Sequence, residues 1–197
     1  MTRMLIMGPP GSGKGTQAER ISERLGVVAI STGDIFRANV KGGTPLGLEA
    51  RKYMDNGDFV PDSVTNEMVR NRLSQDDAKE GFLLDGYPRT VAQVDYLDGI
   101  LAAGEHKLGV VLQLTAVDEE LVSRLLGRAR ETGRSDDNES VIRHRLALYH
   151  QQTEAVVARY AGRGILAEVD GMGGIEDVTD SVMGRIDDVL SAPARGL

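Results

Sequence analysis

The residues Gly8–Thr16, near the start of the chain, have the types and spacing of a phosphate-binding loop. They fit the pattern G-x-x-x-x-G-K-[ST] with Lys14 as the lysine and Gly15 in the Ser/Thr position, so the hydroxyl residue, Thr16, comes one step late. Glycines let backbone N–H groups approach phosphate oxygens, and the lysine adds a positive charge for the outer phosphates. The alternative is a glycine-rich turn that only joins a strand to a helix. The order of strand, loop, lysine and helix favours a site for nucleotide phosphates.

An acidic residue, Asp85, follows a second apolar run at 81–84. A carboxylate at the end of a core strand beside a phosphate loop can hold Mg²⁺ directly or through water, with Thr16 nearby. Asp85 could instead cap the following helix. Because Arg89 comes four residues later, close to where a phosphate would lie, we favour the interpretation that Asp85 helps to hold Mg²⁺.

Two further groups of residues suggest a second nucleotide site. Thr32 and Arg37 lie in the run 31–37, where Thr32 or Asp34 could instead be a helix N-cap and Arg37 a solvated helix residue. Together with Arg89 and Gln93 they indicate a site for a second phosphate group and its base. A glutamine amide can hydrogen-bond both a ring nitrogen and the amino group of adenine, so Gln93 favours an adenine nucleotide.

Several arginines follow in the second half of the chain. Arg124 and Arg128 are four apart and share one helix face, whereas Arg143 and Arg145 are two apart, so only one of these two is predicted to point inward. Arg134 lies in a charged segment between the two helices. Arginines that converge on phosphates would neutralise charge during phosphoryl transfer. The alternative for each arginine is a surface ion pair of little energetic value.

The charged segment 129–138 is predicted to be an exposed loop over the site. It is polar, contains glycine and lies between two long predicted helices. Asp136 and Asp137 could pair with Arg124 or Arg128 and hold the loop over the ligands, or they could be ordinary loop acids.

Strand-like and helix-like segments alternate along the chain, which predicts an α/β fold with a five-stranded parallel sheet and helices on both faces. Ligands are then expected beyond the carboxyl ends of the strands. The mainly helical stretch 31–60 interrupts the alternation and is predicted to be a small helical flap. The predicted strands are 3–7, 27–30, 81–84, 109–114 and 164–168; the predicted helices are 13–24, 33–41, 45–56, 62–73, 91–103, 118–130, 139–160 and 175–190.

Composition narrows the possible classes of protein. A length of 197 residues with 41% hydrophobic residues is enough for one domain with a sizeable core. The net charge of −7 argues against non-specific nucleic-acid binding and against an anionic membrane surface. Cysteine is absent, which excludes disulfides and thiolate metal sites, and a cytoplasmic setting is expected.

These motifs, in this order, resemble those of the adenylate kinases, within the nucleoside monophosphate kinase family. The resemblance covers the chain from Met4 to about Ile186 and rests on motifs of several segments. The motifs are Gly8–Thr16 with its G-K-G-T ending, Ser31–Arg37, Asp85–Thr90 followed by Gln93, Arg124–Arg128, Arg134–Asp137, Arg143–Leu146 with Tyr149 and His150, and Val169–Gly171.

The resemblance implies a P-loop NTPase core over 1–197, an AMP-binding insert at 31–60 and a short lid at 129–138. It implies the reversible reaction MgATP + AMP ⇌ 2 ADP in a monomeric enzyme. The short lid has no zinc-binding cysteines, so no structural zinc is expected. The ATP-binding residues that it implies are Gly11, Ser12, Gly13, Lys14, Gly15, Thr16, Arg128 and the backbone of Gly173. The AMP-binding residues are Thr32, Arg37, Asp58, Phe59, Val60, Gly86, Arg89, Gln93, Arg134 and Arg145. The catalytic residues are Lys14, Arg89, Arg124, Arg128, Arg134 and Arg145.

Two rival functions stay open at the level of sequence. One is a kinase for UMP or CMP, which Gln93 and Thr32 disfavour. The other is a nucleotide-binding switch or assembly module that hydrolyses ATP slowly. Such a module needs no second-site side chains, so Arg37, Arg89 and Gln93 are the residues that discriminate against it.

Overall fold

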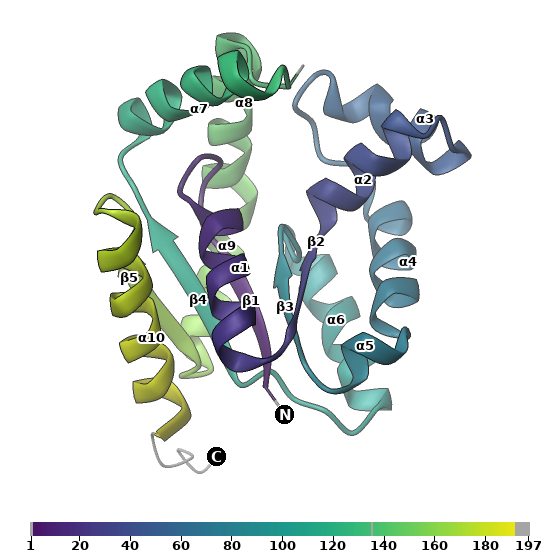
Figure 1. Cartoon of the computed structure of the whole chain (residues 1–197). Helices are drawn as coiled ribbons and strands as arrows, with labels where there is room; N and C mark the ends of the chain where they lie inside the picture. Colours follow the sequence, from purple (N-terminus) through teal and green to yellow (C-terminus); the bar gives the residue numbers. More distant parts are fainter. Residues whose placement is uncertain (1, 135, 192–197) are drawn as a thin grey trace.

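The computed structural model describes residues 2–134 and 136–191, and these form a parallel sheet between layers of helices (Figure 1). The strands pair in parallel in the order β2–β3–β1–β4–β5, which confirms the predicted five-stranded parallel sheet. The strands are β1 (Arg3–Met7), β2 (Val28–Ser31), β3 (Phe82–Asp85), β4 (Val110–Thr115) and β5 (Leu166–Asp170). Because β1 pairs with β3 on one side and with β4 on the other, the chain order reverses at β1, which is where ligands bind in such sheets.

The helices agree closely with the predicted segments. They are α1 (Lys14–Leu25), α2 (Thr32–Lys41), α3 (Pro45–Met54), α4 (Asp62–Leu73), α5 (Asp76–Lys79), α6 (Val91–Ala103), α7 (Asp118–Thr132), α8 (Glu139–Leu148), the π-helical turn η1 (Tyr149–Thr153), α9 (Glu154–Gly162) and α10 (Ile175–Ser191). The short α5 was not predicted, because four residues with one apolar member, Ala78, are too few to show a hydrophobic periodicity. Within the part of the chain that the structure describes, no helix is both long and apolar enough to cross a membrane.

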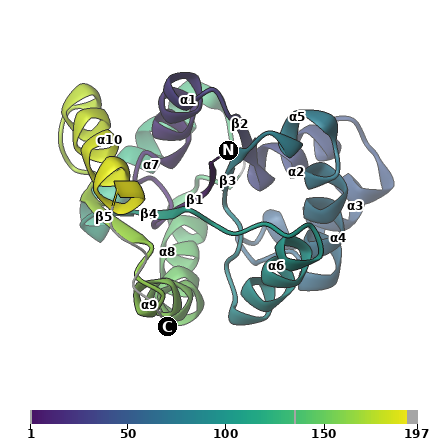
Figure 2. The ribbon, with the colours of Figure 1, turned by 90° about the horizontal axis from the view of Figure 1, so that it is seen from below.

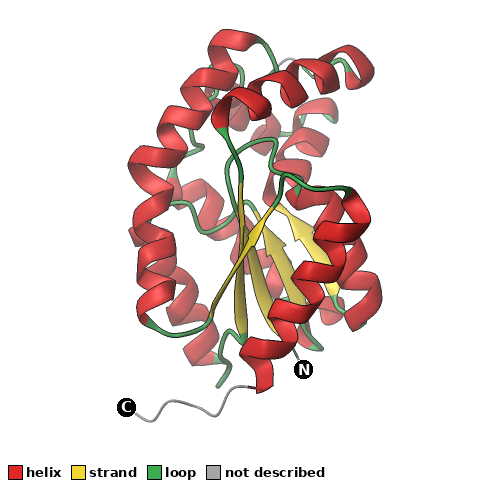
Figure 3. Cartoon of the chain, turned by 90° about the vertical axis from the view of Figure 1, so that its left-hand side faces the viewer, coloured by secondary structure: helices red, strands yellow, loops and turns green. Residues whose placement is uncertain are grey.

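Each face of the sheet packs against its own set of helices, as Figures 2 and 3 show. Met4 and Ile6 lie in a core cluster with α1 and α10, whereas Leu5 and Met7 lie in a second cluster with α4, α6 and α9. All four side chains are buried. A strand covered on both faces reads as a continuous apolar run, which is why β1 and β4 could be recognised from the sequence.

Two helical units lie at the same end of the molecule, beyond the carboxyl ends of the strands (Figure 1). One is the pair α2 and α3; the other contains α7 and α8. The α2–α3 pair is held by a close approach at Gly47, where a Cβ atom would lie only 2.1 Å from the carbonyl oxygen of Asn39. Only glycine fits this contact between the two helices.

The predicted helix 139–160 contains a feature that periodicity does not reveal. Its backbone stays helical, but Tyr149–Thr153 form a π-helical turn between α8 and α9. His150 in this turn lies 2.5 Å from Glu154 and 3.0 Å from Asp118 at the start of α7. The hydrogen bond with Glu154 is the main reason that the pKa of His150 is raised, with Asp118 adding to the effect. The histidine therefore links the start of α7 to the start of α9, where the α7–α8 unit joins the rest of the molecule.

The prediction of an exposed loop over 129–138 is wrong in two respects. Helix α7 continues through Thr132, so the first four residues are helical. Asp136 and Asp137 are buried, because they form ion pairs with Arg128 of α7 and Arg145 of α8. Ser135 lies outside the described residues. Polarity alone does not reveal that a loop carboxylate is covered by its partners.

We predict that Gly47→Ala destabilises the protein by about 1–3 kcal/mol, because the added methyl group forces the backbones of α2 and α3 apart. Gly184→Ala is the matched control: Gly184 is also helical, and its added Cβ would meet no atom within 4 Å. The control should be neutral or more stable by about 0.5–1 kcal/mol. Urea unfolding followed by circular dichroism measures both variants. Equal stability of the two would show that the α2–α3 contact is not constrained by Gly47.

Candidate phosphate-binding cleft

Most of the predicted site residues line one cleft of about 880 Å³, and a smaller cavity of about 70 Å³ adjoins it. The cleft brings together Gly11, Gly13, Lys14, Gly15, Thr16, Arg37, Phe59, Asp85, Gly86, Arg89, Arg124, Arg128, Arg134 and Arg145. The smaller cavity adds Thr32, Asp58, Val60 and Gln93. Ser12 is buried and Gly173 is exposed, and neither lines these cavities.

The phosphate loop begins directly after β1 and ends at the first turn of α1. Gly13 is the N-cap of α1 in a left-handed conformation with φ 91°, which L side chains rarely adopt. The Lys14 ammonium curls back into the loop and donates hydrogen bonds of 2.8 Å to the carbonyl oxygens of Gly8 and Pro9. The loop thus gathers the helix N-terminus and a cation on one side of the cleft.

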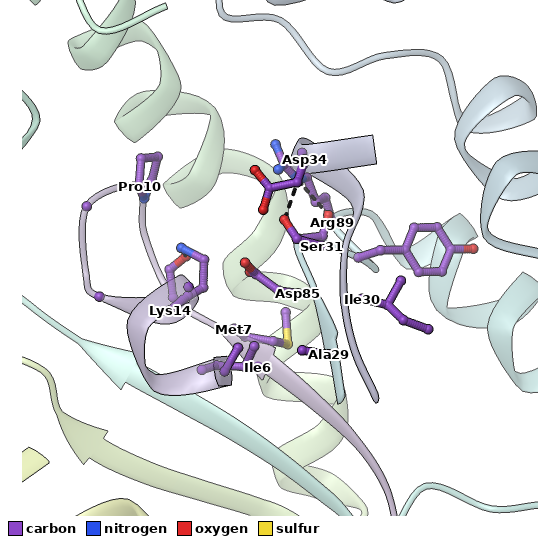
Figure 4. Close-up of a pocket in the computed structure, with 18 of the residues that line it drawn as sticks. Ile6, Met7, Pro10, Lys14, Ala29, Ile30, Ser31, Asp34, Asp85 and Arg89 are labelled. Atoms are coloured by element: carbon purple, nitrogen blue, oxygen red, sulfur yellow. Dashed lines mark hydrogen bonds between the residues drawn. The ribbon is translucent and has the colours of Figure 1, made fainter. Parts of the chain in front are cut away.

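Lys14 faces a carboxylate across the floor of the cleft. Figure 4 shows Asp85, at the end of β3, directed into the space between the phosphate loop and Ser31. Desolvation lowers the pKa of Lys14 to about 8, although the charge of Asp85 opposes this shift. Desolvation likewise raises the pKa of Asp85, opposed by Lys14 and Arg89. A polyanion would stabilise the ammonium of Lys14, and a hard cation would stabilise the carboxylate of Asp85.

Oxygen donors in the cleft suit a hard divalent cation. The Oδ1 atom of Asp85 is buried and has no hydrogen-bond partner among the described residues. Thr16 lines the same cleft and offers a hydroxyl group. In the described part of the chain, no three histidine or carboxylate side chains cluster as a metal site. A cation beside Asp85 would therefore take most of its ligands from water and phosphate oxygens.

Arg89 lies where the two cavities meet. The Nε atom of Arg89 donates a hydrogen bond of 2.8 Å to the carbonyl oxygen of Gly86, and its guanidinium lies 5.0 Å from the centre of the Phe59 ring. The hydroxyl group of Thr153 donates to the backbone carbonyl oxygen of Arg89. Burial, followed by the charge of Arg145, lowers its pKa to about 10, so Arg89 stays protonated near neutral pH. The side chain is a fixed cation with an apolar ring on one face.

Buried carboxylates hold two arginines of α7 and α8. Arg128 donates from Nε and Nη2 to both oxygens of Asp137, at 2.7 and 2.8 Å. Arg145 donates to Asp136 at 3.0 Å and to Asp137 at 3.1 Å. Burial alone would raise the pKa of Asp137, but the hydrogen bonds and charge of Arg128 lower it overall. The prediction that these carboxylates hold the segment is thus supported for Arg128, and Arg145 is a partner that was not predicted.

Arg124 and Arg143 behave differently from this pair. Arg124 donates to the carbonyl oxygens of Gly171 and Met172, so it does not pair with the loop carboxylates as one alternative supposed. It fastens α7 to the segment that contains Gly173. Arg143 is half-exposed and binds Glu119 and Glu139, which leaves Arg145 as the inward arginine and confirms that only one of the two points inward.

Three residues at the site were not predicted from the sequence. Asp62 accepts a hydrogen bond of 2.7 Å from the Gln93 amide. Asp34 pairs with Arg37 at 2.6 Å and lies 3.9 Å from Arg134, linking α2 to the segment after α7. Thr153 belongs to the π-helical turn. Asp34 and Asp62 carried local signals as acids near a helix N-terminus, but these signals say nothing of the distant partners, Arg134 and Gln93.

Comparison with known proteins gives similarities over nearly the whole chain. A family model described as Adenylate kinase matches residues 6–165. A protein named Adenylate kinase from Pseudarthrobacter chlorophenolicus is 82% identical over 186 residues, which cover 94% of this chain and 97% of the relative. The Adenylate kinase of Renibacterium salmoninarum is 75% identical over 192 residues, 98% of this chain and 100% of the relative. That of Kocuria rhizophila is 66% identical over 187 residues, 95% of this chain and 100% of the relative.

We predict that Asp137→Asn lowers the free energy of unfolding at pH 7 by about 2–3 kcal/mol, because Arg128 and Arg145 lose a buried partner. The folded-state pKa of Asp137 lies below its unfolded value of about 3.9, so this stabilisation is present above that pH and is lost as the pH falls through the folded-state pKa.

Urea unfolding at pH 7 and at pH 3 tests this expectation. The difference between wild type and Asp137→Asn should shrink at the lower pH. Asp188→Asn is the control, because Asp188 is exposed and its ion pair with Arg185 is long, at 3.6 Å. A difference that is as large at pH 3 as at pH 7 would contradict a role for the ionised carboxylate.

Proposed function

Because the chain belongs to the adenylate kinase family, we propose that its cleft is the ATP site and that the adjoining small cavity is the AMP site. The protein is an enzyme that transfers a phosphoryl group reversibly between ATP and AMP, with two ADP as products. The assignments of individual residues below are part of the proposal.

The ATP phosphates are proposed to lie against the phosphate loop. Gly11 and residues 13–16, at the N-terminus of α1, line the cleft and would offer backbone N–H groups, and Lys14 would exchange its two carbonyl partners for phosphate oxygens. Arg128, held by Asp137, would lie on the other side of the triphosphate. Arg124 would act indirectly by holding the backbone of 171–172, beside which Gly173 could meet the adenine of ATP.

The AMP is proposed to occupy the small cavity. Gln93 and the segment 58–60 line it around the base, while Thr32 lies beside Gly86 on the way to the larger cleft. The Thr32 hydroxyl donates to the carbonyl oxygen of Asp85, which ties the start of α2 to the end of β3. The two nucleotide sites thus share one wall.

One observation carries this proposal: Arg37, Arg89 and Arg145 line both cavities. Phosphoryl transfer needs the donor and acceptor phosphates side by side and in line, with charge stabilisation and no covalent nucleophile. Three cations at the junction of the cavities would hold the AMP phosphate and the transferred γ-phosphate together. Arg134, near Asp34, would add a fourth from above the cleft.

Magnesium is the proposed cofactor, because Asp85 and Thr16 present oxygen donors beside the phosphate loop. When bound with the nucleotide, the ion would neutralise phosphate charge during transfer. The chain itself would orient this complex through the Asp85 carboxylate and exclude water by covering the cleft with the insert 31–60 and the lid 129–138. The monomeric state and the cytoplasmic location stay predictions.

The decisive experiment measures ADP formed from ATP and Mg²⁺ with AMP, UMP, CMP, GMP or no acceptor. We expect stoichiometric ADP with AMP, loss of activity in Lys14→Met, and a fall of about 10³-fold in Arg89→Ala. Arg51→Ala is the control, since Arg51 is exposed and pairs only with Asp55 among the described residues. Slow ADP release that does not depend on an acceptor would mean an ATPase or switch, and preferred use of UMP or CMP would overturn the AMP assignment.

The lowered pKa of Lys14 gives a second prediction. Phosphate oxygens stabilise the ammonium form, so binding of ATP raises this pKa from about 8 and takes up about half a proton at pH 8. Affinity should fall about tenfold for each pH unit above that value. Calorimetry in two buffers with different ionisation enthalpies measures the uptake. Lys14→Arg keeps the charge but cannot titrate in this range, so equal uptake in both proteins would exclude Lys14 as the source.

A further inference from the structure

The amide of Gln93 is held at both ends by the protein. The side chain is 1% exposed and lines the small cavity. Its Oε1 accepts a hydrogen bond of 2.7 Å from the backbone N–H of Arg89, and its Nε2 donates one of 2.7 Å to Oδ1 of Asp62. Asp62 is the first residue of α4 and lines neither cavity, so it reaches the cavity only through this amide.

These two partners allow the amide only one orientation. The backbone N–H of Arg89 can only donate, and the carboxylate of Asp62 can only accept. Turning the amide of Gln93 by 180° would set its oxygen against the carboxylate and its NH₂ group against the N–H. Two hydrogen bonds would become two repulsive contacts. The orientation is therefore fixed by chemistry.

Asp62 is itself held in place. Its other oxygen, Oδ2, accepts a hydrogen bond of 2.9 Å from the Thr90 hydroxyl. Thr90 caps α6 by accepting from the backbone N–H of Gln93 at 3.2 Å. The four residues Asp62, Arg89, Thr90 and Gln93 form one network that joins the start of α4 to the start of α6.

The fixed amide leaves a defined pattern toward a base. One lone pair on Oε1 and one N–H on Nε2 stay available. They match a base with an amino donor next to a ring-nitrogen acceptor, which is the arrangement of adenine. Hypoxanthine, guanine and uracil present an oxygen acceptor next to an N–H donor, so they would need the opposite orientation. Cytosine has the adenine-like pattern but only one ring.

We propose that Asp62 is a positioning residue that determines base specificity: by holding Nε2 of Gln93, it makes the cavity select a 6-amino purine over a 6-oxo purine. This inference rests on the proposed AMP site. Asp62 touches neither substrate nor reacting atoms, and it acts by denying Gln93 the orientation that a 6-oxo base requires.

The test compares AMP with IMP as acceptors, because the two differ only on the edge that the amide would read. In Asp62→Asn the new amide can accept or donate, so turning Gln93 creates one repulsive contact, with the backbone N–H of Arg89, instead of two. The ratio of kcat/KM for AMP to kcat/KM for IMP should fall at least about tenfold, the effect of losing one hydrogen bond to a charged partner. The KM for ATP should not change.

Controls separate a change in the orientation of the Gln93 amide from a general loss of folded enzyme. Both acceptors are assayed on the same preparation, so the fraction of folded enzyme cancels in the ratio. Asp55→Asn removes an exposed carboxylate that pairs with Arg51 in the insert 31–60 and should keep the wild-type ratio. Asp62→Glu, which keeps an obligatory acceptor, should retain most of the selectivity.

The outcomes distinguish this inference from the proposed function. A wild-type ratio that favours AMP and falls in Asp62→Asn supports the inference. A wild-type ratio that favours AMP but is unchanged within twofold in Asp62→Asn overturns it and leaves the AMP site intact. A wild-type enzyme that does not prefer AMP overturns both.

Discussion

Positive charges crowded into one partly desolvated cleft are the constraint on which the arrangement depends. Lys14, Arg37, Arg89, Arg128 and Arg145 all line it, and burial lowers the pKa of Lys14, Arg89 and Arg145. Such a cluster repels itself unless carboxylates or phosphates lie among its members. The protein supplies carboxylates from three separate segments, at Asp34, at Asp85 and at 136–137, and the nucleotides would supply the rest.

The carboxylates differ in how firmly they hold their arginines. Asp137 is buried and grips Arg128 with two hydrogen bonds, whereas Asp34 is exposed and holds Arg37 with one. Arg128 is thereby oriented before any ligand binds, which reduces the ordering that phosphate binding requires. Arg37 can change partner more easily. The wall of the cleft at Arg128 is therefore more rigid than the wall at Arg37.

The same principle of fixed polar groups operates in the small cavity. There the hydrogen bonds of Gln93 are directed by a backbone N–H and a carboxylate, so a neutral side chain gains a defined polarity. His144 also lies 2.7 Å from Asp58, the start of the segment that lines this cavity. Helix α8 therefore meets this cavity through Arg145, which lines it, and meets its wall through the contact of His144 with Asp58. Movement of α8 would alter both nucleotide sites together.

The parts of this protein that depend on local pattern could be predicted from its amino-acid sequence. The loop Gly8–Thr16 is contiguous, and the buried strands β1 and β4 read as apolar runs because helices cover both faces of the sheet. The spacing of Arg143 and Arg145 was enough to show that only one could point inward, because helix geometry relates residues a few positions apart.

Contacts between residues far apart in the sequence could not be predicted, because they depend on how the elements pack. Asp62 and Gln93 are 31 residues apart, and Arg89 and Thr153 are 64 apart, so no periodicity links them. The sequence left open whether Asp136 and Asp137 pair with arginines or are ordinary loop acids, and the packing of α7 and α8 brings Arg128 and Arg145 to them. The physical reason is that a side chain's partners, and hence its burial, its pKa and its orientation, depend on packing between elements. Local sequence specifies the elements, and their packing in three dimensions specifies the site.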